Sequence, residues 1–189
     1  MTPAYRSYSV YSLLVLFSLL TMTMTFSGVA AENQPAETGK MNNERLNLLI
    51  RKIDKNVNGK PGFWRFSVED TIVTVVTDER ADRMRIIIPI VEAKELDEKM
   101  MFRLLQANFD SALDARYSIA KGLLWSAYIH PLSPLDDRTF LSAIGQSVNL
   151  LKTYGSNFSS GALIFKGGDS EGLQRRKLID DLIKKGMAI

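Results

Sequence analysis

The chain has 189 residues with 24 basic and 21 acidic side chains, a formal net charge of +3 and no cysteine. This length suits one domain with a self-sufficient hydrophobic core, and the lack of cysteine excludes a disulfide framework. The basic excess is too small, and too evenly mixed with acidic residues, to predict a nucleic-acid binder.

The first 31 residues predict a secretory signal peptide. A single cation, Arg6, precedes an apolar run over 10–26, and the small residues Val29 and Ala31 stand just before Glu32. That order is typical of a signal peptide cleaved after Ala31, and it predicts a periplasmic or secreted protein. An uncleaved membrane anchor is the alternative, although a run of 17 residues is shorter than the roughly 20 that span a bilayer.

Residues 32–42 are polar, include Pro35 and Gly39, and predict a flexible leader. A helix is expected from Asn43, ended by the sequence NGKPG at 58–62. Its apolar residues have the spacing of an amphipathic helix. They are Leu46, Leu49, Ile50, Ile53 and Val57.

Three runs at 63–68, 71–78 and 83–91 have the apolar patterns of strands and predict an antiparallel meander. The third run is apolar on both faces, with Ile87 and Val91 on the minority face, so either both faces are covered or one is a contact surface. Pro89 has no N–H to donate, which predicts a sheet edge or a bulge there.

A second helix is predicted from Asp97, and its acidic first turn suits the helix dipole. One apolar stripe is expected to face the core, with Asn108 on it bonding a buried backbone group. The stripe consists of Met100, Met101, Leu104, Leu105, Asn108 and Phe109.

Two strands follow at 115–122 and 123–130, joined at Lys121-Gly122. In the second of them, alternation puts Leu123, Trp125, Ala127 and Ile129 on one face. The other face, which carries His130, is expected to be the wetter one.

A third helix is expected to begin with Ser133 as its N-cap and to end at Tyr154-Gly155. Beyond it, 161–168 are strand-like, and a last helix over 173–185 places Leu178, Ile179 and Leu182 on one side.

The order helix, three strands, helix, two strands, helix resembles the Tir-chaperone-like fold of type III secretion chaperones and YbjN-like proteins. The likeness is carried by LLQAN, ARYSIA, LLWSAYIHPLSPLD and FLSAIGQSVNLLKTYG, and spans roughly 43–154. It implies an α+β domain with an antiparallel sheet over 43–154. The strand-helix extension over 155–189, which is expected to pack on this domain, departs from the family pattern. Family members present hydrophobic sheet surfaces to an extended protein segment, commonly as homodimers. Secretion chaperones are typically cytosolic and acidic, whereas this chain has an export signal and a basic excess.

The segment Gly168–Gly172 matches the G-x-S-x-G pattern of a hydrolase nucleophile elbow, with Ser170 as its serine. However, the only histidine, His130, precedes Ser170, which is opposite to the chain order of that fold. The alternative is that Asp169 or Ser170 caps the last helix. A lone histidine does not supply the three or four ligands of a zinc site, so no metal or other cofactor is expected.

The sequence therefore predicts a non-catalytic protein- or peptide-binding domain of the bacterial envelope. A serine hydrolase centred on Ser170 and a purely structural envelope protein are the alternatives. Because one layer of helices covers only one face of a sheet, Val73, Val75, Ile87 and Val91 are candidate partner-binding residues. The last helix is expected to cover this face in part, and a second copy or an apolar peptide to cover the rest.

We predict that the mature protein begins at Glu32, because Val29 and Ala31 occupy the recognition positions of the cleavage site. Intact-mass measurement on protein isolated from the cell envelope checks this. Retention of residues 1–31 would instead mean an anchored protein.

Overall fold

The structure, a computed structural model, describes residues 39–161 and 170–188, with the side chains of the last helix described from Arg176 onward. Its elements in chain order are α2 (Asn43–Ile53), β1 (Asn58–Lys60), β2 (Phe63–Val68), β3 (Thr71–Asp78), β4 (Arg83–Glu92), the 3₁₀ turn η1 (Ala93–Glu95), α3 (Glu98–Asp110), β5 (Arg116–Ala120), β6 (Leu123–Pro131), α4 (Asp137–Lys152) and α5 (Ser170–Met187).

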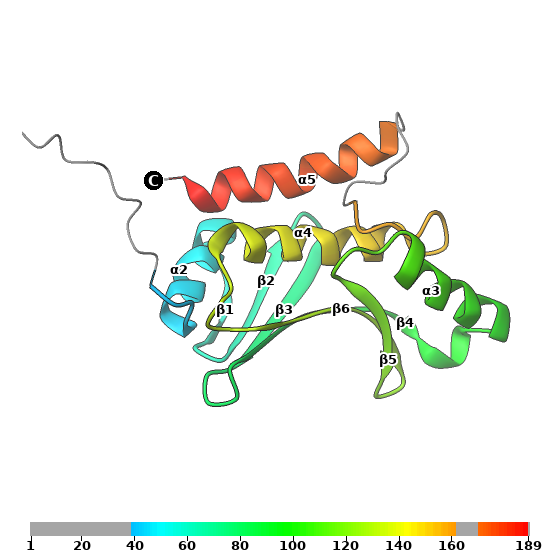
Figure 1. Cartoon of the computed structure of the whole chain (residues 1–189), viewed down its shortest axis with the longest axis horizontal. Coiled ribbons are helices and arrows are strands. Elements are labelled where there is room, and N and C mark those ends of the chain that lie inside the picture. Colours follow the sequence, from blue (N-terminus) through cyan, green and yellow to red (C-terminus); the bar gives the residue numbers. More distant parts are fainter. Residues whose placement is uncertain (1–38, 162–169, 189) are drawn as a thin grey trace, which may run out of the picture. The chain divides into compact units, whose positions relative to one another are not determined.

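The strands form one six-stranded antiparallel sheet in the order β1-β2-β3-β4-β6-β5 (Figure 1). The α+β class and the three-strand meander are confirmed. The predicted order of helices and strands over 43–154 is also the observed one, apart from the short strand β1, which lies where only a helix stop was expected. The strand expected over 161–168 lies outside the described residues except for Gly161. Lys121 and Gly122 have φ of 52° and 74°, so they form the two-residue turn of the β5–β6 hairpin.

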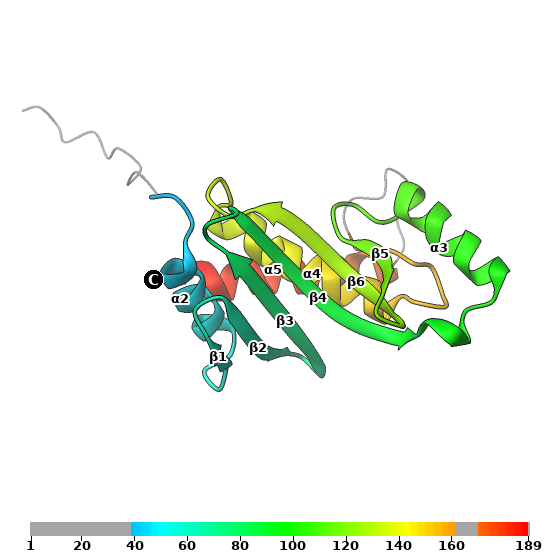
Figure 2. The same ribbon diagram turned by 90° about the horizontal axis from the view of Figure 1, so that it is seen from below.

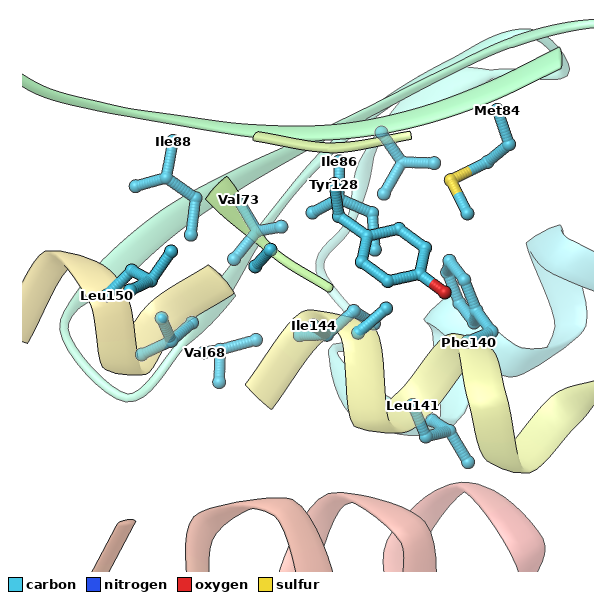
Figure 3. Packing of buried hydrophobic residues seen from close by; sticks show 14 of the residues in the cluster. Val68, Val73, Met84, Ile86, Ile88, Tyr128, Phe140, Leu141, Ile144 and Leu150 are labelled. Atoms are coloured by element: carbon cyan, nitrogen blue, oxygen red, sulfur yellow. The ribbon is translucent and has the colours of Figure 1, made fainter. Parts of the chain in front are cut away.

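One face of the sheet, which we call the helix face, packs against α2 and α4 and forms the core (Figure 3). The large side chains Trp64, Met84 and Ile86 on it are fully buried. From the other side α4 is covered by α5, so the layers are sheet, α4 and α5 (Figure 1). For this reason nearly every residue of α4 from Phe140 to Leu150 is buried.

Two glycines let α4 and α5 approach closely. A Cβ on Gly145 would lie 2.7 Å from Cγ1 of Ile179, and a Cβ on Gly186 would lie 2.5 Å from Cδ2 of Leu141. Leu141 points away from the sheet toward α5 (Figure 3). Both contacts therefore depend on residues that have no side chain.

The bulge predicted at Pro89 is present. The register of β4 against β6 shifts between Pro89 and Val91, and the pairing of β4 with β3 ends at Ile87. Pro89 therefore lies beyond the part of β4 that pairs with β3, and a proline costs the sheet no hydrogen bond on that side.

The predicted start of the third helix is wrong by three residues. Asp136, not Ser133, is the N-cap of α4, and its carboxylate accepts from Thr139 N at 2.8 Å. The hydroxyl of Ser133 instead donates to Asp82 at 2.9 Å, and Ser133 N donates to the same carboxylate at 2.6 Å. Ser133 thus ties the loop before α4 to the β3–β4 turn.

We predict that Ser126→Ala raises the free energy of unfolding by about 1 kcal/mol, since a buried hydroxyl without a partner costs stability. Ser126 is fully buried in β6, and its Oγ has no hydrogen-bond partner among the described residues. Urea titration measures the change, with Ser118→Ala on the exposed side of β5 as the control. A loss of stability in Ser126→Ala would show that the hydroxyl is satisfied in solution.

Candidate protein-binding surfaces

Helix α3 lies along the β5 edge of the sheet and is attached there by Asn108. Its Nδ2 donates to Tyr117 O at 3.0 Å, and Tyr117 N donates to its Oδ1 at 2.8 Å. The amide group therefore bonds the strand's main chain as a neighbouring strand would. The predicted role of Asn108 is confirmed.

The other side of α3 is apolar and exposed. The predicted single stripe facing the core is wrong, because the helix buries only Leu104 and Ala107. Its exposed apolar residues, with Ile119 of the adjacent strand, make up what we call the α3 surface. They are Met101 (39% exposed), Phe102 (64%), Leu105 (68%), Phe109 (91%) and Ile119 (51%).

A groove of about 360 Å³ runs between α3 and the β5–β6 hairpin and is largely apolar. It is lined by Met101, Leu104, Leu105, Asn108, Tyr117, Ser118, Ile119 and Leu124. β5 is the last strand of the sheet, so its outer edge has no neighbouring strand. Asn108 bonds this edge at Tyr117, and the main chain of Ile119 continues the same edge two residues further on. The α3 surface is thus continuous with a sheet edge.

The second surface is the face of the sheet opposite α4, which we call the outer face. No described helix lies over it, and in Figure 2 the strands stand in front of α4 and α5. Phe63, Ile72 and Ile129 on it are 43%, 48% and 55% exposed, and Trp125 is half-buried. Large apolar side chains on an uncovered sheet mark an interaction surface.

Strand register arranges the centre of the outer face in two rows that cross the strands. The Arg65 row consists of Asn58, Arg65, Thr74, Ile87, Ala127 and Arg116. The Arg85 row consists of Lys60, Phe63, Val76, Arg85 and Ile129.

Of the four predicted partner-binding residues, the structure places only Ile87 on the outer face. Val73 and Val75 are fully buried on the helix face, so their assignment to a surface is wrong. Val91 pairs with the buried Leu124, because the bulge after Pro89 reverses the alternation, and it packs in part against the core. Period-two counting across the bulge could not show this.

The prediction that the face of β6 carrying His130 is the wetter one is also wrong. Leu124, Ser126 and Tyr128 are buried under α4, and His130 shares their face through its register with Met84. Trp125 and Ile129 instead face outward. The residues opposite β6 on its neighbouring strands indicate which face is exposed. Trp125 lies opposite Ser118 and Pro89, and Ile129 lies opposite Arg85. The alternation within β6 alone does not contain this information.

The expectation that the last helix partly covers the open face is wrong for its described part, because α5 packs on the far side of α4. The proposed nucleophile elbow lies mostly outside the described residues: 168 and 169 are not described, nor is the side chain of Ser170. His130 Nδ1 lies 2.6 Å from Pro131 O, and its ring stacks on Tyr128 at 6.0 Å.

The clear pKa shifts lie in the scaffold. Hydrogen bonds from Ser133 N and Oγ lower the pKa of Asp82, and a hydrogen bond from Ser67 N lowers that of Asp54. Burial raises the pKa of Tyr128 to about 12. Within the described ranges, no three His, Cys, Asp or Glu side chains gather as a metal site would require, and no helix is long and apolar enough to cross a bilayer.

A scan against protein-family models finds no match, and a search of curated proteins finds none either. Six chains of solved structures match, and two of them are described here. One is a chain of the HopA1–SchA chaperone–effector complex, with a TM-score of 0.45 and 12% identity, over 59% of this chain and 94% of that chain. The other belongs to the complex of the Yersinia pestis type III secretion chaperone SycH with a stable fragment of YscM2, with a TM-score of 0.42 and 15% identity, over 59% of this chain and 99% of that chain. Both TM-scores lie below 0.5.

Proposed function

We propose that this protein is an exported, non-catalytic protein-binding domain that pairs with a second copy through the α3 surface and holds a protein partner on the outer face. The observation that carries the proposal is the presence of large exposed apolar side chains on two separate surfaces of a domain whose core is otherwise closed. Soluble monomers rarely expose such patches without a partner.

The α3 surface suits a second copy because its apolar residues are evenly spaced along one helix. If two copies of α3 pack antiparallel with Leu105 at the twofold axis, Met101 of each lies opposite Phe109 of the other. Full burial of such a side chain stabilises by about 1.5–3 kcal/mol. Phe102 and Leu105, each more than 60% exposed, would lose most of their contact with water.

The outer face suits a different protein. Its exposed apolar side chains stand between arginines, and arginine and aromatic residues are enriched in protein interfaces. Its centre is formed by side chains that are half-buried in the sheet, Ile87 among them. A partner segment can therefore lie on it without an opening of the domain.

The export part of the proposal rests on the sequence. The order of Arg6, the apolar run 10–26 and Ala31 is that of a cleaved signal peptide. The non-catalytic part is supported by the surroundings of His130, which bonds a main-chain carbonyl and stacks on Tyr128, away from both surfaces.

We predict that the mature protein is a dimer in analytical ultracentrifugation and that Leu105→Asp makes it monomeric. A charge at the centre of the interface weakens dimerisation by about 30-fold or more, the value of one interface hot spot. Leu48→Asp on α2 is the matched control, since Leu48 is 60% exposed on another helix and should leave the dimer intact. A monomer at high concentration, or equal effects of the two substitutions, would exclude pairing through α3.

We further predict that a photo-crosslinking amino acid at Ile129 captures a discrete protein partner in intact cells. The same group at Leu48 should capture none, because Leu48 lies on α2 away from the outer face. Mass spectrometry of the products decides it. Equal products from the two positions, or none from Ile129, would mean that the outer face binds no protein.

A further inference from the structure

The two central rows of the outer face hold only positive charges. They contain four cations, Lys60, Arg65, Arg85 and Arg116, and no acidic residue. The chain as a whole is nearly balanced, with 24 basic and 21 acidic side chains. Positive charge is therefore concentrated at the centre of this face.

Asp78, an acidic residue of the outer face, lies at the margin of this face, and its carboxylate already accepts hydrogen bonds there. Asp78 pairs in register with Arg83, and its carboxylate also accepts from Arg80 N and Ala81 N at 3.0 Å each. By contrast, Arg65 and Arg85 are exposed and have no ion pair or side-chain hydrogen bond among the described residues. These two guanidinium groups are available to a partner.

The Arg65 row fixes the spacing of the charges. Arg65 on β2 and Arg116 on β5 stand four strand steps apart, which is about 19 Å at 4.8 Å per step. Thr74, Ile87 and Ala127 lie between them. An extended chain covers this span with about six residues.

We infer that the outer face binds an extended protein segment that has an apolar centre and acidic residues on both sides. One carboxylate meets Arg65 at one end of the row, and another meets Arg116 at the other end, where Nη1 of Arg116 already donates to Ala112 O, while the apolar centre lies over Ile87 and Ala127. Arg85 is on the same strand as Ile87, two residues away, so it flanks the centre and adds positive charge beside it. This inference rests on the proposed function and names the chemistry of its partner.

Two features favour a protein segment over an anionic membrane or a nucleic acid. The middle of the Arg65 row is formed by half-buried Thr74, Ile87 and Ala127, which do not protrude as membrane-inserting side chains do. The basic excess of the chain, 24 basic against 21 acidic side chains, is also too small for the electrostatic footprint of a nucleic-acid binder.

The test uses the mature chain and a synthetic peptide with an apolar centre of about six residues flanked by glutamates. Fluorescence anisotropy should show binding that weakens as salt rises. Arg65→Glu with Arg85→Glu should weaken it by about tenfold or more, and Arg65→Gln with Arg85→Gln by an intermediate factor. Arg51→Glu on α2 with Lys55→Glu in the turn just after it, which we call the α2 variant and which removes as many exposed cations, should change it by less than about twofold.

The inference is overturned if a lysine-flanked version of the peptide binds equally well, or if the α2 variant loses as much affinity as the outer-face variant. It is also overturned if vesicles containing phosphatidylglycerol, or a single-stranded oligothymidylate, bind with the same arginine dependence while the peptide does not. If a protein is captured at Ile129 but the arginine substitutions leave peptide affinity unchanged, the acidic nature of the partner segment is refuted and the proposed function is not. Failure of capture at Ile129 would refute the proposed function itself.

Discussion

The packing of α4 on one face of the sheet is the interaction on which the rest of the structure depends. α4 is buried between the strands and α5, with Phe140 and Ile144 in contact with the sheet core and Leu141 directed at α5. Because both helical layers stand on the same side, nothing in the described part of the chain lies over the other side of the sheet. The outer face is open because both helical layers lie on the opposite face of the sheet.

The placement of α3 is the second consequence of this arrangement. α4 reaches across β3, β4, β6 and β5, and α3 is left beside the β5 edge. Asn108 joins it to Tyr117 by two hydrogen bonds, and Tyr117 in turn donates from its hydroxyl to Leu150 O at 2.8 Å. The helix is therefore held by polar bonds on one side, while its apolar residues Phe102, Leu105 and Phe109 remain in water.

Sequence reasoning located the elements well and the faces less well. Periodicity predicted β2, β3 and the start of α2 correctly, because each has one buried side in a regular element. The predicted end of α2 was wrong, since the helix stops at Ile53 and Val57 lies outside it. Val73 and Val75 were assigned to a surface because β3 carries apolar residues on both sides, and only the position of α4 decides which side is buried. The bulge after Pro89 could be foreseen, yet its effect on the orientation of Val91 needed the register against β6.

The α3 surface was missed for a related reason. Leu104 and Leu105 are neighbours on one apolar helix, and the sequence alone does not tell which of them faces the core. The outer-face cations were equally hidden, because Arg65, Arg85 and Arg116 lie on three strands and come together only through the strand order. Local patterns predict elements, whereas the sites here are made by long-range pairing.

Hydroxyl-radical footprinting of the purified protein over a range of concentrations tests the division into two surfaces most directly. The account predicts that Met101 and Phe109 lose reactivity as the concentration rises, while Phe63 and Ile129 stay reactive at every concentration because the outer face awaits a different partner. Protection of Phe63 and Ile129 in the pure protein, with Met101 and Phe109 still reactive, would contradict it.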